Sequence, residues 1–249
     1  MDIKVLKDIL SANDQMAERN RALLDSKKVT VFNIMSSPGS GKTSLILETI
    51  RALKKQVRIG VIEGDIASTI DAQKVGEEKV PVVQINTGGE CHLEAGQVGR
   101  ALESLPLDKI DLLLVENVGN LVCPGEFKLG EHKKVLILSV PEGDDKVHKY
   151  PLLFSMADAI VISKIDLLPY ARFDIPGFLK AIKGMNRKAK IFQVSCTTHE
   201  GIEEWAKWVR SSIARQGQRS RNRSGPSETP DCPVRPGRGI TPRYSSRAS

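Results

Sequence analysis

Seven short apolar runs are spaced along the chain, and segments with a helical pattern lie between them. Most of the runs are almost continuously apolar, as expected for strands that helices cover on both faces of a sheet. The runs comprise residues 29–35, 57–62, 82–85, 110–116, 134–140, 159–163 and 190–195. The segments with helical spacing comprise residues 42–54, 68–77, 93–104, 145–155, 175–185 and 202–214. This alternation predicts an α/β fold, with a doubly wound, mainly parallel sheet and helices on both of its faces.

Two segments of different composition flank the alternating region. Residues 1–26 are expected to form a short N-terminal helical extension, because Ile3, Leu6 and Ile9 recur at helical spacing and a second helical piece follows. Residues 217–249 are rich in Arg, Ser, Pro and Gly and hold few large apolar side chains, so we predict a disordered tail. The folded domain is therefore predicted to span residues 27–216.

The chain of 249 residues has a net charge of +7, and most of that charge lies in the predicted tail. Residues 217–249 contain seven Arg against Glu228 and Asp231, a contribution of +5, which leaves +2 for the rest. This balance predicts no nucleic-acid partner. No apolar run reaches transmembrane length, and the charged first residues lack the apolar core of a signal peptide. We therefore expect a cytoplasmic protein with no membrane partner, whose four cysteines are free thiols or metal ligands.

The sequence SSPGSGKT has the features of a phosphate-binding loop. It follows a predicted strand and opens a predicted helix, the context in which such a loop binds a nucleoside triphosphate with Mg²⁺. Its glycines let the backbone wrap closely around phosphate oxygens, while Lys42 can reach the β- and γ-phosphates and Thr43 can ligate Mg²⁺. Ser36 stands where the general consensus has glycine. The predicted phosphate-binding residues are Pro38, Gly39, Ser40, Gly41, Lys42, Thr43 and Ser44.

Two carboxylates end predicted strands near this loop. Asp65 closes the sequence VIEGD, and Glu116 begins ENVG, where a metal-binding carboxylate followed by a switch glycine is expected. Both lie at the carboxyl-terminal edge of the predicted sheet, where ligands of open α/β sheets bind. We predict that Thr43, Asp65 and Glu116 serve the Mg²⁺ and that, with Lys42, they form the catalytic set. Which carboxylate touches the metal stays open.

The sequence SKID at 163–166 favours guanine as the base. A carboxylate at Asp166 can accept hydrogen bonds from guanine N1–H and the 2-amino group, which adenine cannot supply. The stem of Lys164 can lie along the purine, and Ser195 and Cys196 follow the last predicted strand, where GTPases have a loop behind the base. We predict GTP and GDP as the ligands.

Three further side chains are candidate metal ligands. Cys91 and His92 are adjacent, and Cys123 follows Glu116 by seven residues. Thiolate and imidazole ligate Zn²⁺, Ni²⁺ or copper. Spacing alone also allows buried structural cysteines, so both interpretations remain open on the residues themselves.

Six sequence blocks in order resemble the HypB family, GTPases that help to deliver nickel to nickel–iron hydrogenase. The blocks are SSPGSGKT, VIEGD, TGGECHLEA, ENVGNLVCP, SVPEGDDKVHKYP and SKID. In that family the phosphate loop commonly departs from the first consensus glycine. The resemblance implies that Cys91, His92 and Cys123 bind Ni²⁺ or Zn²⁺ at a subunit interface. It also implies a homodimer that forms on nucleotide or metal binding, and as partners another hydrogenase maturation protein and the hydrogenase large subunit.

Together these features predict a GTP-hydrolysing metallochaperone that assists nickel insertion and whose GTP-dependent dimerisation gates the Cys/His site. No residue is recognisable as the group that positions the attacking water, so we expect slow intrinsic turnover. The chain lacks an N-terminal CxxCGC block and a His-rich run, which argues against nickel storage. The alternatives are a urease-type nickel accessory GTPase, a P-loop small-molecule kinase and a structural zinc protein.

Overall fold

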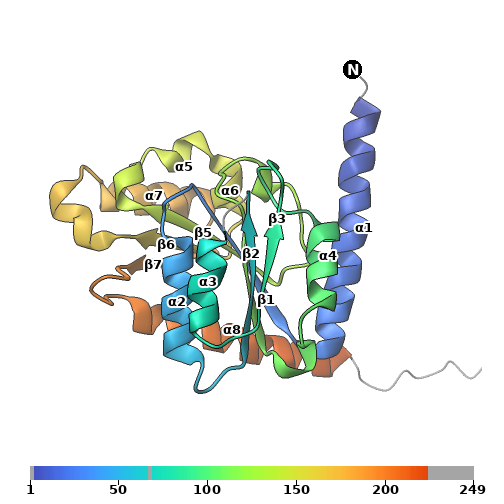
Figure 1. Ribbon diagram of the computed structural model, residues 1–249. Helices are drawn as coiled ribbons and strands as arrows, with labels where there is room; N and C mark the ends of the chain where they lie inside the picture. The colour runs from blue at the N-terminus through green and yellow to red at the C-terminus, as the bar shows by residue number, and fades with distance from the viewer. Residues whose placement is uncertain (1–2, 67–68, 224–249) are drawn as a thin grey trace, which may run out of the picture.

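The fold is built on a single sheet of seven parallel strands (Figure 1). The computed structural model describes residues 3–66 and 69–223. The strands are β1 (Thr30–Ser36), β2 (Ile59–Asp65), β3 (Val82–Asn86), β4 (Leu112–Glu116), β5 (Lys133–Ser139), β6 (Ala159–Ser163) and β7 (Lys190–Val194). Their order across the sheet is β3-β2-β4-β1-β5-β6-β7. The predicted α/β architecture is confirmed, and every strand pair is parallel.

Helices cover both faces of this sheet. They are α1 (Ile3–Lys27), α2 (Lys42–Leu53), α3 (Ile70–Glu77), α4 (Ala95–Glu103), α5 (Lys146–Lys149), α6 (Pro151–Met156), α7 (Ile175–Met185) and α8 (Ile202–Arg223). Residues of α2, α3 and α8 share one apolar core with the sheet, and two further cores, one formed with α1 and α4 and one with α6 and α7, lie on the other face. None of the helices in the described ranges is both long and apolar enough to cross a bilayer.

Two of the predicted elements differ from those observed. The single helix predicted at 145–155 is two helices, because Pro151 begins α6 and leaves Tyr150 outside helical geometry. Helix α8 continues to Arg223, so residues 217–223, which we had assigned to the disordered tail, are helical. A shortage of apolar side chains does not stop a helix, and Gln and Arg have good helix propensity. The predicted disorder of residues 224–249 lies outside the described residues.

The N-terminal helix is one continuous element that packs along α4 (Figure 1). Its Leu24 is buried in the core shared with α4, and two of its polar side chains, Asn13 and Asn20, are also buried. Asn20 Nδ2 donates hydrogen bonds to the carbonyl oxygens of Ala95 and Leu129. Helix α1 is therefore fixed to the rest of the domain by specific polar contacts as well as apolar packing.

Candidate nucleotide and metal site

The phosphate loop joins β1 to α2 at the carboxyl-terminal edge of the sheet. Gly39 and Gly41 have φ angles of 74° and 95°, in the left-handed region that glycine occupies without strain. Lys42 is buried, and its Nζ donates to Ser36 Oγ at 3.2 Å. Ser36 therefore supplies a polar partner for the lysine from the position where the consensus has glycine.

A cleft of about 480 Å³ opens over this loop. Of the predicted phosphate and magnesium residues, all except Ser40 border it. They are Pro38, Gly39, Gly41, Lys42, Thr43, Ser44, Asp65 and Glu116. Asp71 and Lys74 of α3 also border the cleft, and their side chains form an ion pair at 2.9 Å. No motif in the sequence of α3 predicts its position at the cleft.

Two carboxyl groups meet beneath the cleft, on neighbouring strands. Glu63 of β2 is in register with Glu116 of β4, and Glu116 Oε1 accepts a hydrogen bond from Thr43 Oγ1 at 3.1 Å. Burial, together with the charge of Glu116, raises the pKa of Glu63 to about 10. Burial also raises the pKa of Glu116, although the charge of Lys42 opposes this. The sequence VIEGD contains Glu63, but its pairing with Glu116 depends on the order of the strands in the sheet, which the sequence does not show.

These oxygen atoms suit a magnesium ion. Within the described part of the chain, Glu63 Oε1 and Glu116 Oε2 are buried without a hydrogen-bond partner. Unpaired buried carboxylate oxygens are costly, and a hard divalent cation with oxygen ligands would satisfy them. Thr43, Glu116 and Asp65 are the residues that would hold the ion at the edge of the cleft, and Glu63 lies close enough to Glu116 to orient it.

A second pocket, of about 190 Å³, adjoins the phosphate loop where SKID follows β6. Lys164 Nζ donates to the carbonyl oxygen of Gly39, and Ser163 Oγ donates to that of Ser40, both at 2.7 Å. Lys164 has a φ of 59°, so the chain turns sharply after β6. The SKID segment is therefore hydrogen-bonded directly to the phosphate loop.

The predicted base-binding residues are only partly brought together. Asp166 and Cys196 line the pocket, together with Thr197, which sequence reasoning did not single out. Burial raises the pKa of Cys196 to about 11, so this thiol is neutral near pH 7. Ser195 does not line the pocket: it is fully buried, and its Oγ accepts from the backbone N–H groups of Thr197 and Thr198. Its role is to shape the turn that carries Cys196.

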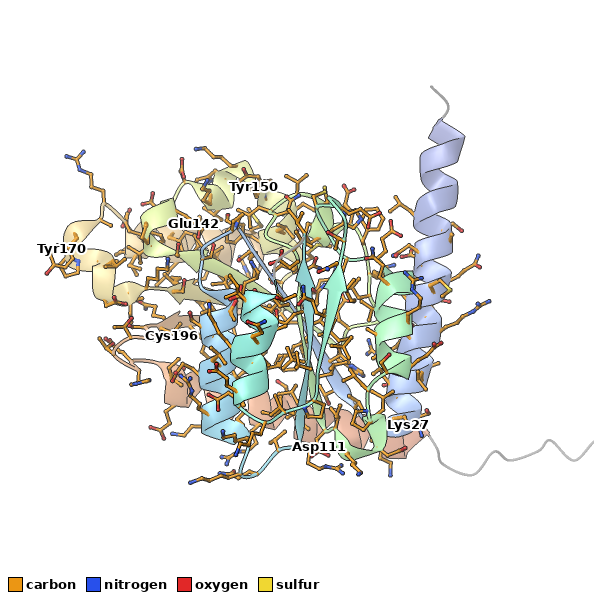
Figure 2. The ribbon with its side chains drawn as sticks, viewed as in Figure 1. Lys27, Asp111, Glu142, Tyr150, Tyr170 and Cys196 are labelled. Atoms are coloured by element: carbon orange, nitrogen blue, oxygen red, sulfur yellow. The ribbon has the colours of Figure 1, made fainter. Side chains whose placement is uncertain are left out.

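Glu142, labelled in Figure 2, is a site residue that the sequence did not identify. It belongs to the block PEGDDKVHKYP, which contains no motif with a recognisable chemical role. Its Oε2 accepts hydrogen bonds from Ser40 Oγ at 2.6 Å and from the backbone N and Oγ of Ser139. Burial opposes ionisation, but hydrogen bonds from Ser37, Ser40 and Ser139 hold the pKa of Glu142 below its usual value. Glu142 is therefore an ionised side chain that supports the phosphate loop through its hydrogen bond with Ser40.

The three candidate metal ligands are brought together, although 32 residues separate the two cysteines in sequence. One ligand atom from each of Cys91, His92 and Cys123 lies within 4.8 Å of the others. Cys91 Sγ is 3.1 Å from Cys123 Sγ and 3.6 Å from His92 Nδ1. The hydrogen bond with Cys91, added to burial, raises the pKa of Cys123. Two thiols and an imidazole converging in this way form a donor set that suits Zn²⁺ or Ni²⁺.

Aromatic packing fixes the imidazole in this cluster. The ring centroid of Phe127 lies 3.9 Å from that of His92. His92 Nε2 is buried, and within the described residues it makes no hydrogen bond, with Glu94 3.9 Å away. Nδ1 is therefore the ring nitrogen that faces the thiols.

The fold and these sites define a P-loop nucleotide-binding protein with a Cys/His metal-ligand cluster. Residues 30–193 match the family described as CobW/HypB/UreG, nucleotide-binding domain. The chain belongs to this family and, within it, to the HypB proteins. It is 44% identical over 207 residues to the hydrogenase maturation factor HypB of Escherichia coli, an alignment that covers 83% of this chain and 71% of that protein.

Two solved HypB structures have the same fold. The crystal structure of HypB from Archaeoglobus fulgidus matches with a TM-score of 0.77 and 40% identity, over 82% of this chain and 99% of that one. HypB from Helicobacter pylori, solved in complex with nickel, also matches with a TM-score of 0.77, at 35% identity over 88% of this chain and 99% of that one. The resemblance drawn from the sequence blocks is confirmed.

Proposed function

We propose that this protein is a GTP-hydrolysing metallochaperone that assists nickel insertion into a nickel–iron hydrogenase. The observation that carries the proposal is the convergence of Cys91, His92 and Cys123 within 4.8 Å, at the same edge of the sheet as the phosphate loop. Similarity to hydrogenase maturation factors, one of them solved with nickel, supports nickel as the cargo. We assign this activity to a domain spanning residues 27–216.

Guanine specificity is part of the proposal. Asp166 borders the small pocket beside the phosphate loop, where its carboxylate can accept hydrogen bonds from N1–H and the 2-amino group of guanine. Adenine would leave this acceptor unpaired. The contact of Lys164 with Gly39 supports the same assignment, because it places SKID against the loop that binds the phosphates. A small-molecule kinase would leave this arrangement without a role.

Hydrolysis would use the residues around the larger cleft. Lys42 would bind the β- and γ-phosphates, and Thr43 and Glu116 would hold Mg²⁺, with Asp65 at the rim. The magnesium ion would neutralise charge that develops on the transferred phosphoryl group. Slow intrinsic turnover remains part of the proposal, because no residue has been identified that positions the attacking water.

The metal site is expected to need more than one chain. Three ligands leave a four-coordinate shell incomplete, and a second copy of the protein or a water molecule can complete it. We therefore propose a homodimer that forms on nucleotide or metal binding and that acts with another maturation protein on the hydrogenase large subunit. A urease-type role fits less well, because the relative at 44% identity is a hydrogenase maturation factor.

Nucleotide titration tests the guanine assignment. The purified protein should bind GTP much more tightly than ATP, and Asp166→Asn should shift the preference toward xanthosine triphosphate, whose C2 oxygen requires a donor. Equal affinity of the wild-type protein for GTP and ATP would contradict guanine specificity.

Equilibrium dialysis against Ni²⁺ and Zn²⁺ tests the metal site. Cys123→Ser should bind either ion much more weakly than the wild-type protein. Cys196→Ser is the matched control, because that thiol lies in the base pocket and outside the Cys/His cluster. Metal binding that is unchanged in Cys123→Ser would place the site elsewhere.

A further inference from the structure

The loop that carries Cys91 and His92 is hydrogen-bonded at its start and at its end to residues that follow or close the strands at the nucleotide cleft. At its start, the backbone N–H of Thr87 donates to the carbonyl oxygen of Asp65 at 2.9 Å. At its end, the backbone N–H of Leu93 donates to Asn117 Oδ1 at 3.0 Å. Leu93 directly follows the imidazole ligand, so the second bond fixes the backbone next to a metal-binding side chain.

Asn117 connects this loop to the nucleotide side. It directly follows Glu116, borders the cleft and is fully buried. Its Oδ1 accepts from the backbone N–H groups of both Leu93 and Val118 at 3.0 Å. Its Nδ2 donates to Asn33 Oδ1 of β1 at 3.1 Å. We call residues 116–119 the switch segment and residues 87–93 the ligand loop. One side-chain oxygen, Asn117 Oδ1, therefore joins the backbone of the switch segment to the end of the ligand loop.

Close packing around Asn117 leaves little room for the switch segment and the ligand loop to move independently of each other. A Cβ atom added to Gly119 would lie 2.9 Å from the backbone nitrogen of Pro38, so the switch segment is in close contact with the phosphate loop. A Cβ added to Gly64 would lie 2.8 Å from the side chain of Leu93, so the end of the ligand loop is in close contact with β2. A displacement of the switch segment is therefore expected to reach Leu93.

Helix α1 fixes the far side of both ligand segments. Asn13 Oδ1 accepts from the N–H of Ala95, and Asn13 Nδ2 donates to the carbonyl oxygen of Lys128. Asn20 Nδ2 bonds the carbonyl oxygens of Ala95 and Leu129. These anchors lie just after His92 and after Cys123 in sequence, and none of them borders the cleft. The backbone near the metal ligands is thus attached to Asn117 on the side of the nucleotide cleft and to the asparagines of α1 on the side away from it.

We propose that Asn117 is the positioning residue through which the γ-phosphate sets the geometry of the Cys91–His92 ligands relative to Cys123. The inference rests on the proposed function, since it specifies how GTP would control that metal site. In GTPases the γ-phosphate and Mg²⁺ order the switch segments, which are released on hydrolysis. Movement of residues 116–119 changes the position of Asn117 Oδ1, and with it the backbone of Leu93 next to His92.

The variant Asn117→Leu tests this by removing both acceptor contacts while keeping the branched shape of the side chain. Ni²⁺ affinity is measured by competition with a chromophoric chelator, once with Mg²⁺ and GDP and once with Mg²⁺ and a non-hydrolysable GTP analogue. For the wild-type protein, the two affinities should differ by a factor of roughly 5 to 150, the usual range of coupling between sites. In Asn117→Leu the ratio of the two affinities should fall to within about twofold of one.

Asn20→Leu is the matched control, because it also removes buried amide contacts to the ligand segments but on the α1 side. It should weaken Ni²⁺ binding in both nucleotide states and leave the ratio unchanged. A wild-type ratio well above one that persists in Asn117→Leu overturns the role of Asn117 and leaves the proposed function standing. A wild-type ratio of one overturns control of the metal site by the γ-phosphate, and with it the role of Asn117, while the nucleotide titration and the dialysis of Cys123→Ser test the proposed function separately.

Residue-resolved amide hydrogen exchange on the wild-type protein decides the question should Asn117→Leu not fold. The amides of Leu93 and Val118, which share Asn117 Oδ1, should change protection together between the GDP and GTP-analogue states. The amide of Ala95, which donates to Asn13 of α1, should not change. Equal protection of Leu93 in the two states would overturn the proposal.

Discussion

Replacing Glu63 by Gln should stabilise the nucleotide-free protein. The carboxyl of Glu63 is almost fully buried and is aligned with Glu116 on the neighbouring strand. Burial and the charge of Glu116 raise its pKa to about 10, so near pH 7 Glu63 is protonated in the folded chain. In the unfolded chain the same group ionises near its ordinary pKa of 4.5. Folding therefore takes up a proton at this position.

The size of the effect follows from proton linkage. Between the two pKa values the folded state binds one proton more than the unfolded state, so the free energy of unfolding falls as the pH rises. The slope is about 1.4 kcal/mol per pH unit, which from pH 4.5 to pH 7 amounts to roughly 3 kcal/mol. This amount does not depend on the folded-state value as long as it lies above 7. Gln cannot ionise, so Glu63→Gln should avoid most of this loss.

Urea unfolding without nucleotide or Mg²⁺, between about pH 5 and pH 8, measures the difference. Glu63→Gln should be nearly as stable as the wild-type protein at the acidic end and more stable by up to roughly 3 kcal/mol near pH 7. Glu103→Gln, on the exposed face of α4, is the control and should show no such trend. If the stability advantage of Glu63→Gln did not grow with pH, the uptake of a proton by Glu63 on folding would be refuted.

Two further substitutions test other contacts. Gly119→Ala would place a Cβ 2.9 Å from the backbone nitrogen of Pro38 and should weaken Mg²⁺–GTP binding by roughly tenfold in a titration; Gly96→Ala, with open space at that point, should bind normally. Burial holds the pKa of His132 below its usual value, and its Nδ1 accepts from the backbone N–H of Val31, so the folded chain resists protonation there. The melting temperature of the wild-type protein should therefore fall as the pH drops below about 6.5. The melting temperature of His132→Asn, which keeps an acceptor for the N–H of Val31, should fall less. An equal fall in both proteins would contradict this prediction.

The strands and the phosphate loop could be predicted because their signals are local. Each buried parallel strand is a short apolar run between turn signals, and β6 was predicted with the bounds that the structure has. The loop is contiguous in sequence, so its residue types alone define its chemistry. The boundary between α5 and α6 was also a local signal, since Pro151 disfavours helical geometry at Tyr150, but the apolar periodicity across it masked the break.

The contacts that sequence reasoning missed all join distant segments. Glu142 is 102 residues from Ser40 in sequence, and no pattern in either segment predicts the hydrogen bond between them. The asparagines of α1 are polar residues at buried positions, contrary to the usual expectation that such side chains face solvent. Their burial is explained only by the backbone groups of α4 that they satisfy. Residue types identify a ligand, whereas the residues that orient it are visible only in three dimensions.

The order of the strands brings the proposed nucleotide and metal sites to the same edge of the sheet. Strands β3, β2 and β4 are neighbours, and their carboxyl-terminal ends lead, respectively, into the loop with Cys91, the rim residue Asp65 and the segment with Asn117. Because the strands are parallel, these three ends lie at one edge of the sheet, a single strand spacing apart. The proposed communication between the sites would then require only one shared hydrogen-bond acceptor, Asn117 Oδ1. An antiparallel arrangement would have placed the end of the middle strand on the opposite edge.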